Sequence, residues 1–138
     1  MPDKGLKTRL SRRQEDDIAD VLPSAQRTPA SGSRRESHDV QGIITDTNEW
    51  WRFRYEAKCT QNKSYSFKLD EWKQLVSDVY SRDAQERPAW AIRFYGDGLS
   101  NAPVLQDLVA IDLNDWCELL EELERLRGLI QVIKKTSK

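Results

Sequence analysis

Residues 39–60 read DVQGIITDTNEWWRFRYEAKCT and contain two strand-like segments separated by four polar residues. The segments DVQGIIT (39–45) and WWRFRYEAKCT (50–60) are rich in β-branched and aromatic residues, which is typical of strands. The intervening DTNE contains Asp46 and Asn48, residue types that favour tight turns. The sequence therefore predicts an antiparallel hairpin.

The alignment of this hairpin brings charged side chains together. If the turn is centred between Thr47 and Asn48, antiparallel pairing places Asp39 opposite Glu56. Directly opposed residues have Cβ atoms about 4.5–5.5 Å apart on one face of the sheet. Because side chains alternate along a strand, Lys58 shares the face of Glu56. Two carboxylates and a lysine are thus expected at one place.

Such a cluster fits a divalent cation. Two close carboxylates raise each other's pKa unless a positive charge compensates them. Mg²⁺ binds a few carboxylates together with waters and phosphate oxygens, so Asp39 and Glu56 are candidate ligands for phosphodiester hydrolysis, with Mn²⁺ as a substitute. Lys58 is expected to orient the attacking water or to offset transition-state charge. Glu36 is an alternative ligand, whereas Asp46 is expected in the turn. An ordinary solvated polar strand face also explains an E-x-K pattern.

The N-terminal part supplies a third acid. A capping-box pattern at Ser11 and the proline after position 22 predict a short helix over residues 12–22, after a flexible N-terminus at residues 1–10. Glu15 falls on the apolar face of this helix, where a carboxylate loses hydration and needs a partner. We expect it to complete the metal site, although it also suits a helix that only needs negative charge in its first turns.

A loop rich in small and basic residues leads into the strand acid. Its serine hydroxyls, and backbone N–H groups that glycine leaves unobstructed, can bind a phosphate. Its arginines attract the DNA backbone. The residues concerned are Ser31, Gly32, Ser33, Arg34 and Arg35. Lys63 extends a basic region that covers residues 50–68. A flexible linker with solvated arginines is the alternative.

The rest of the chain alternates helical and strand patterns. LDEWKQLVSDVY (69–80) has helical spacing, AWAIRFY (89–95) and DLVAIDL (107–113) are strand-like, and a last helix capped by Asp112 or Asn114 runs to about Arg127. The order α-β-β-α-β-β-α predicts one α/β domain, residues 11–128, with a central mixed sheet flanked by helices and a C-terminal tail at 129–138.

Several apolar residues are assigned to the interior. Trp72, Trp90 and Trp116 fall at inward positions and are expected in the core or a dimer interface. Leu119, Leu120 and Leu123 are expected to face inward from the last helix. Trp50 and Trp51 are adjacent in the strand and therefore face opposite sides. An exposed one of the two could stack on a base or on a partner subunit, and the sequence does not indicate which of them is exposed.

The composition indicates which metal sites, thiol states and cellular location to expect. The chain has 138 residues, a net charge of -1 and two cysteines with a single histidine. This argues against a structural zinc site and for reduced thiols at Cys59 and Cys117. No apolar run approaches the length of a membrane span, and no secretory signal is expected, so we expect a cytoplasmic protein without membrane contact.

Three segments together resemble a known family. RRQEDDIADVL (12–22), PASGSRRESHDV (29–40) and YEAKCT (55–60) are similar to motifs of the archaeal-type Holliday junction resolvases of the PD-(D/E)-x-K nuclease superfamily. The resemblance covers residues 11 to about 80. It implies a restriction-endonuclease-like fold and a homodimeric, magnesium-dependent endonuclease that resolves four-way DNA junctions by paired incisions.

The resemblance also implies roles for single residues. Glu15 matches the helix glutamate, Ser31 the loop serine, and Asp39 the superfamily aspartate, while Glu56 and Lys58 match the E-x-K pair. His38 stands where the motif usually has proline, and it either binds a ligand or phosphate or is a plain substitution. The alternatives to a junction resolvase are a related nuclease for other branched DNA and a non-catalytic DNA or protein interaction module.

Overall fold

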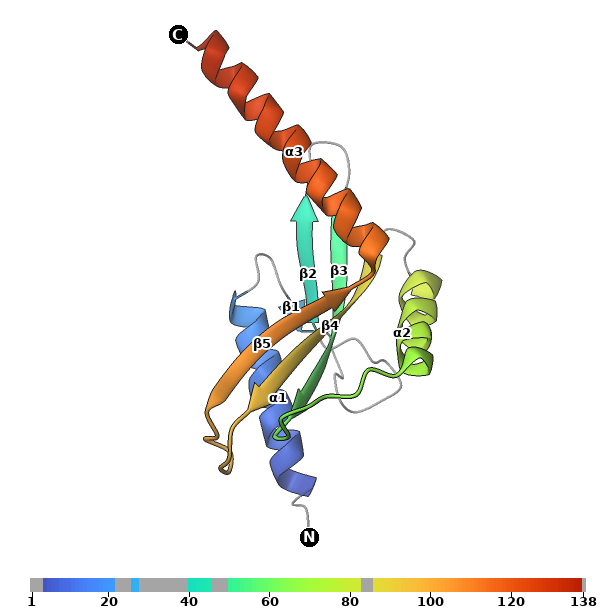
Figure 1. The fold of residues 1–138 in the computed structure, drawn as a ribbon, viewed down its shortest axis with the longest axis vertical. Coiled ribbons are helices and arrows are strands. Elements are labelled where there is room, and N and C mark those ends of the chain that lie inside the picture. The colour runs from blue at the N-terminus through green and yellow to red at the C-terminus, as the bar shows by residue number, and fades with distance from the viewer. Residues whose placement is uncertain (1–3, 22–25, 28–39, 46–49, 83–85, 138) are drawn as a thin grey trace.

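The computed structural model describes residues 4–21, 26–27, 40–45, 50–82 and 86–137. It is an α/β fold in which helices flank a five-stranded mixed sheet (Figure 1). The elements are α1 (Lys4–Val21), β1 (Gln26–Arg27), β2 (Val40–Thr45), β3 (Trp50–Thr60), α2 (Leu69–Arg82), β4 (Glu86–Tyr95), β5 (Val104–Ile111) and α3 (Leu113–Thr136). The strands follow chain order across the sheet, and β3 and β4 form its parallel pair. The expected mixed sheet with flanking helices is confirmed.

The β2–β3 hairpin has the predicted alignment. Val40 pairs with Tyr55, and the pairing continues in register to Thr45 and Trp50. The predicted opposition of Asp39 and Glu56 rests on this alignment. Asp39 itself lies outside the described residues, as does the turn at 46–49 with Asp46.

The two faces of the sheet carry different helices (Figure 1). On one face, α1 contributes Ile18 to a cluster that contains Phe53 and Tyr55 of β3. On the other face, Leu75 of α2 packs with Trp90 of β4. The alternation of side chains along β3 therefore sends Phe53 and Tyr55 toward α1, and sends Arg54, Glu56 and Lys58 toward α2.

The first helix begins at Lys4, so the predictions of a helix starting at residue 12 and of a flexible segment over residues 1–10 were wrong. Leu10 is 3% exposed and packs with Tyr95 and Ala102, while Leu6 lies against the same cluster. This contact with the far end of β4 stabilises two additional helical turns. Ser11 is consequently an interior helix residue rather than a cap.

The last helix also exceeds its predicted bounds. Asp112 caps it as expected, accepting hydrogen bonds from the backbone N–H groups of Asn114 at 2.8 Å and Asp115 at 3.2 Å. The helix continues through Gly128 to Thr136, so the prediction of an end near Arg127 was wrong. One glycine costs about 1 kcal/mol in a helix, which good helix formers on either side can offset.

The interior assignments are confirmed in part. Trp90 is buried, and Trp72 is half-buried with its ring 5.1 Å from that of Trp90. Leu119 packs against the core, but Leu120 and Leu123 are 42% and 53% exposed, so their inward assignment was wrong; Trp116 is 46% exposed and lies outside the core, and its alternative place in a dimer interface stays a prediction. The helical spacing was correct, but α3 packs against too little of the domain to cover an apolar stripe.

Candidate active site on strand β3

A contact pair on the α2 face of β3 forms the centre of the candidate site. The ammonium nitrogen Nζ of Lys58 lies 2.8 Å from the carboxylate oxygen Oε1 of Glu56. The indole Nε1 of Trp90 donates a hydrogen bond of 3.2 Å to the same oxygen. Within the described part of the chain, the second carboxylate oxygen, Oε2, has no donor. Glu56 therefore keeps one oxygen for a further ligand.

The protonation state of Lys58 follows from this contact. Its partial burial acts to lower its pKa, but the hydrogen bond and the negative charge of Glu56 outweigh burial, and the pKa is raised. Tyr65 and Glu71 act in the same direction. Lys58 is therefore a cation at neutral pH. It is suited to orient a water or to stabilise negative charge, and it is not suited to act as a general base.

A second ion pair, between Arg54 and Glu86, lies on the same face of β3. Arg54 binds the Glu86 carboxylate through Nε at 2.5 Å and Nη2 at 2.8 Å. The two side chains are 12% and 3% exposed. This bidentate pair involves the first residue of β4, which begins at Glu86, three residues before the predicted start at Ala89. It also leaves Glu56 and Lys58 as the more exposed charged pair of this row.

Aromatic side chains fix the surroundings of Glu56. Trp90 is 2% exposed, and Trp72 and Phe67 lie against its ring at centroid distances of 5.1 and 5.9 Å. Trp90 reaches Glu56 because the parallel β3–β4 register pairs these two residues. Sequence reasoning assigned Trp90 to the core but missed its hydrogen bond, since nothing local indicates which residue of a distant parallel strand lies beside Glu56.

Glu15 occupies a different place from the one expected. It is 5% exposed on α1, which packs on the sheet face opposite to the Glu56 side chain. Over the part of the chain that the structure describes, no group of three or more His, Cys, Asp or Glu residues is arranged to hold a metal ion. Glu15 and Glu56 thus lie on opposite faces of the sheet, while Asp39 lies outside the described residues, and the role of Glu15 stays a prediction.

The remaining predicted site residues fall mostly in segments without a described structure. Outside the described residues lie Ser31, Gly32, Ser33, Arg34, Arg35, Glu36 and His38. Lys63 is described and is exposed in the segment that follows β3. The backbones of Trp50 and Trp51 belong to β3, but their side chains are outside the described part.

Gln14 is a residue that sequence reasoning used only for a cap. Its side-chain Nε2 donates to the backbone oxygens of Lys58 and Ala91, each at 3.0 Å. Gln14 is 1% exposed, and its Oε1 is buried with no hydrogen-bond partner among the residues that the structure describes. One buried amide therefore connects α1 to both strands of the parallel pair, at the position of the E-x-K lysine.

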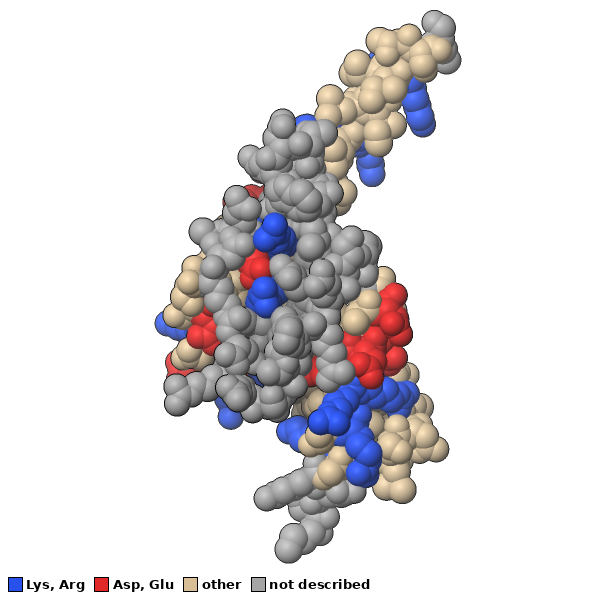
Figure 2. Space-filling model, turned by 180° about the vertical axis from the view of Figure 1, so that it is seen from behind, with Lys and Arg blue, Asp and Glu red and all other residues tan. Residues whose placement is uncertain are grey.

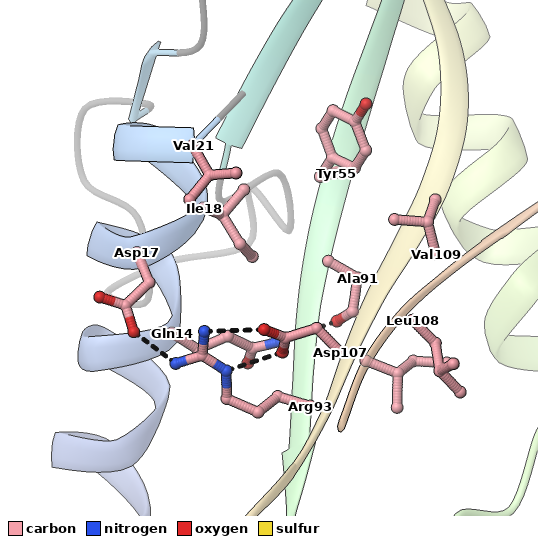
Figure 3. Close-up of a pocket in the computed structure, with 11 residues that line it drawn as sticks. Gln14, Asp17, Ile18, Val21, Tyr55, Ala91, Arg93, Asp107, Leu108 and Val109 are labelled. Atoms are coloured by element: carbon pink, nitrogen blue, oxygen red, sulfur yellow. Dashed lines mark hydrogen bonds and ion pairs between the residues drawn. The ribbon is translucent and has the colours of Figure 1, made fainter. Parts of the chain in front are cut away.

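A small pocket lies between α1 and β5 (Figure 3). It has a volume of about 180 Å³, and its lining is mostly apolar, with Ile18 and Tyr55 among the residues that face it. At its side, Arg93 binds Asp17 of α1 at 2.6 Å and Asp107 of β5 at 2.8 Å. Because it lies on the α1 face, this pocket is separated by the sheet from Glu56 and Lys58.

The charges of α1 are segregated along its length. Basic residues occupy its first half and acidic residues its second half, a separation also seen in Figure 2, where a blue group borders a red one. The residues are Lys7, Arg9, Arg12 and Arg13, followed by Glu15, Asp16, Asp17 and Asp20. This order opposes the helix dipole, which favours acids at the N-terminus and bases at the C-terminus. It concentrates positive charge at one end of the domain.

Comparison with known proteins gives a negative result. No family model matches the chain, and a search of curated proteins finds no match.

Among the helices of the described residues, none combines the length and apolar composition needed to cross a membrane.

Proposed function

We propose that this chain is a magnesium-dependent endonuclease that acts on branched DNA, with four-way junctions as its substrate and a restriction-endonuclease-like fold. The proposal rests on one observation, the 2.8 Å contact between Glu56 and Lys58 on a hairpin that has the predicted register, with Val40 opposite Tyr55. The resemblance of residues 12–22, 29–40 and 55–60 to the junction resolvases supports the same function.

The donor set around Glu56 fits a hard divalent cation. Oε2 of Glu56 has no donor among the described residues, and in this proposal Asp39, which the predicted pairing sets opposite Glu56, supplies the second carboxylate. Carboxylate oxygens are the protein ligands that Mg²⁺ prefers. When bound, the ion polarises the scissile phosphate and lowers the pKa of a bound water.

The chain's own residues supply the rest of the chemistry. Trp90 holds Glu56 in place through its indole N–H, so the free oxygen has a fixed direction. Lys58 stays protonated beside Glu56. Its positive charge is available to the pentacoordinate phosphorus group of the transition state or to the attacking water. Ser31 contributes in this proposal as a phosphate contact, whereas Glu15 lies on the α1 face of the sheet and is not needed at this metal site.

DNA binding rests on positive charge outside the E-x-K strand. The first half of α1 concentrates Lys and Arg where a helix dipole disfavours them, and this arrangement gains stability when an anionic backbone approaches. Arg34, Arg35 and Lys63 add further basic groups, with Gly32 and Ser33 leaving the loop backbone accessible. Two copies acting together would give the paired incisions of a resolvase.

A non-catalytic interaction module is the second candidate. It is favoured by the partners that Glu56 already has, because a carboxylate bound to Lys58 and Trp90 also serves as a purely structural polar contact. A nuclease specific for flaps or nicked duplexes differs from the resolvase only in substrate.

Cleavage of labelled four-way junction, flap and linear duplex, with Mg²⁺, Mn²⁺ or EDTA, separates these functions. We expect junction cleavage that needs the metal and is lost in Glu56→Gln and Lys58→Met. Junction binding and thermal stability are expected to persist in both variants. Glu121→Gln, at an exposed position on α3, is the matched control and should cleave normally. Absence of metal-dependent cleavage of every substrate by the wild-type chain would establish the module instead.

A further inference from the structure

The second half of α3 extends away from the domain. Figure 1 shows the helix continuing beyond the sheet and α2. Its first turns are attached by Arg87 of β4, which binds Asp115 and lies 2.8 Å from Glu118. Leu119 packs on the core, but no other described helix or strand packs extensively along the rest of α3. At 1.5 Å per residue, the 24-residue helix is about 36 Å long, so most of its length is unsupported.

This unsupported helix exposes large apolar side chains. Between 42% and 64% of the surface of each of Trp116, Leu120, Leu123, Leu129, Ile130 and Ile133 is exposed. Isolated helices of this length are marginal in water, and helices in proteins gain most of their stability by packing an apolar face. Monomeric proteins rarely leave a contiguous apolar surface of this kind uncovered. The described residues of the domain therefore leave the apolar face of α3 largely uncovered.

The spacing of the apolar residues identifies the kind of partner. Trp116, Leu123 and Ile130 recur every seven residues, and Leu119, Leu126 and Ile133 repeat with the same period three residues later. This is the a and d pattern of a coiled coil, in which one helix packs against another with the same repeat. Leu126 is half-buried, and the a and d positions after it are exposed. The repeat is therefore most available where the helix leaves the domain.

The charges beside this seam favour a second copy of the same chain. In the heptad frame Glu122 occupies a g position and Arg127 the e position of the next heptad. In a parallel pair of identical helices, a g residue faces the e residue of the following heptad on the other helix. Glu122, whose carboxylate also lies 2.5 Å from Arg125 of its own helix, then comes within reach of Arg127 of the other copy, and twofold symmetry places this opposite-charge pair on both sides. Gly128 lies at the outermost f position, where an added Cβ would meet no neighbouring atom of the described residues within 4 Å.

We propose that α3 forms a parallel two-stranded coiled coil with α3 of a second copy, with Trp116, Leu123 and Ile130 in its seam. The surface is separate from the Glu56–Lys58 site, and the inference does not depend on nuclease activity. Dimerisation is measured as mass, so its failure and the failure of the cleavage proposal are distinguishable.

The test is light scattering of the full chain across a concentration series. We expect twice the mass of one chain for wild type, and the mass of one chain for Ile130→Glu. Val132→Glu is the matched control, because Val132 is 57% exposed compared with 53% for Ile130 but occupies a c position outside the seam. This control should remain dimeric. Both side chains are exposed in the single chain, so neither change should impair folding.

Cysteine cross-linking tests the orientation. In a Cys117→Ser background, Ile130→Cys should form an intermolecular disulfide under mild oxidation, whereas Val132→Cys should not. A wild-type chain with the mass of one copy at every concentration overturns the proposal, and so does an equal effect of the two glutamate variants. A dimer in which Ile130→Cys does not cross-link overturns the parallel seam.

Discussion

The side-chain amide of Gln14 donates a 3.0 Å hydrogen bond to the backbone oxygen of Lys58. The same nitrogen also binds the backbone oxygen of Ala91, so a single buried residue joins the first helix to the two parallel strands. The strand that presents the E-x-K pair is therefore held from behind by α1, while its side chains face α2. This arrangement leads to predictions about both stability and the candidate site.

Gln14→Ala should destabilise the fold by about 1–3 kcal/mol, because two backbone oxygens lose a buried donor. The free energy of unfolding in urea measures the loss. Gln74→Ala is the control: Gln74 also makes a side-chain hydrogen bond, to Asp78 at 2.9 Å, but on an exposed helix surface. Its effect should stay within about 0.5 kcal/mol. Equal effects of the two substitutions would contradict the connecting role of Gln14.

Lys58 should give a characteristic pH dependence. Its folded-state pKa is raised because Glu56 outweighs the opposing effect of burial. The stabilisation from this shift is fully present below the unfolded-state pKa of about 10.4 and is lost as the pH rises through the folded-state value. The stability difference between wild type and Lys58→Met should therefore be constant near neutrality and shrink at alkaline pH.

The comparison must be made as a difference, because Tyr65 also has a raised pKa, chiefly from burial, and titrates in the alkaline range. Glu56→Gln provides the control. Without the carboxylate, the alkaline change attributable to Lys58 should be strongly reduced. A wild-type difference that stays constant up to strongly alkaline pH would show that Glu56 does not stabilise the ammonium form.

Arg93→Met should loosen the attachment of α1 to β5. Arg93 is 6% exposed in its side chain and binds both Asp17 and Asp107, whose carboxylates are about half exposed. Partly solvated partners reduce the loss below that of a fully buried pair, so we expect about 1–3 kcal/mol. Denaturant unfolding measures this, and Arg125→Met, which disrupts an exposed i,i+3 pair with Glu122, should cost much less.

Arg87→Met should release the start of α3. Burial raises the pKa of Asp115, and Arg87 opposes that effect through its hydrogen bond and charge. Without Arg87 the buried carboxylate is uncompensated, and amide hydrogen exchange should accelerate over residues 113–123. Exchange in α2 should change little. Uniform acceleration over the whole domain would indicate a loss of global stability instead of a local detachment.

Local patterns were sufficient for several features of the candidate site. The hairpin alignment followed from the position of the turn, and the shared face of Arg54, Glu56 and Lys58 followed from the two-residue period of a strand. The Asp112 cap was equally local, since a cap depends on its own side chain and the next three backbone N–H groups.

Other features required contacts between distant segments. The two additional turns of α1 depend on Leu10 packing beside Tyr95. The exposure of Leu123 reflects the absence of a described element beside it, which helical periodicity does not reveal. Trp90 and Gln14 became part of the site description only through the parallel register of β3 and β4 and the docking of α1.

The sequence by itself determined the hairpin, its register and the placement of Glu56 beside Lys58, because turn position and strand alternation act over a few neighbouring residues. Only the tertiary structure decided that Trp90 binds Glu56, that Gln14 supports Lys58 from the opposite face, and that α3 leaves the domain with its apolar side chains exposed. These outcomes depend on which distant surfaces meet, and burial and hydrogen bonding of those surfaces are collective properties of the folded chain.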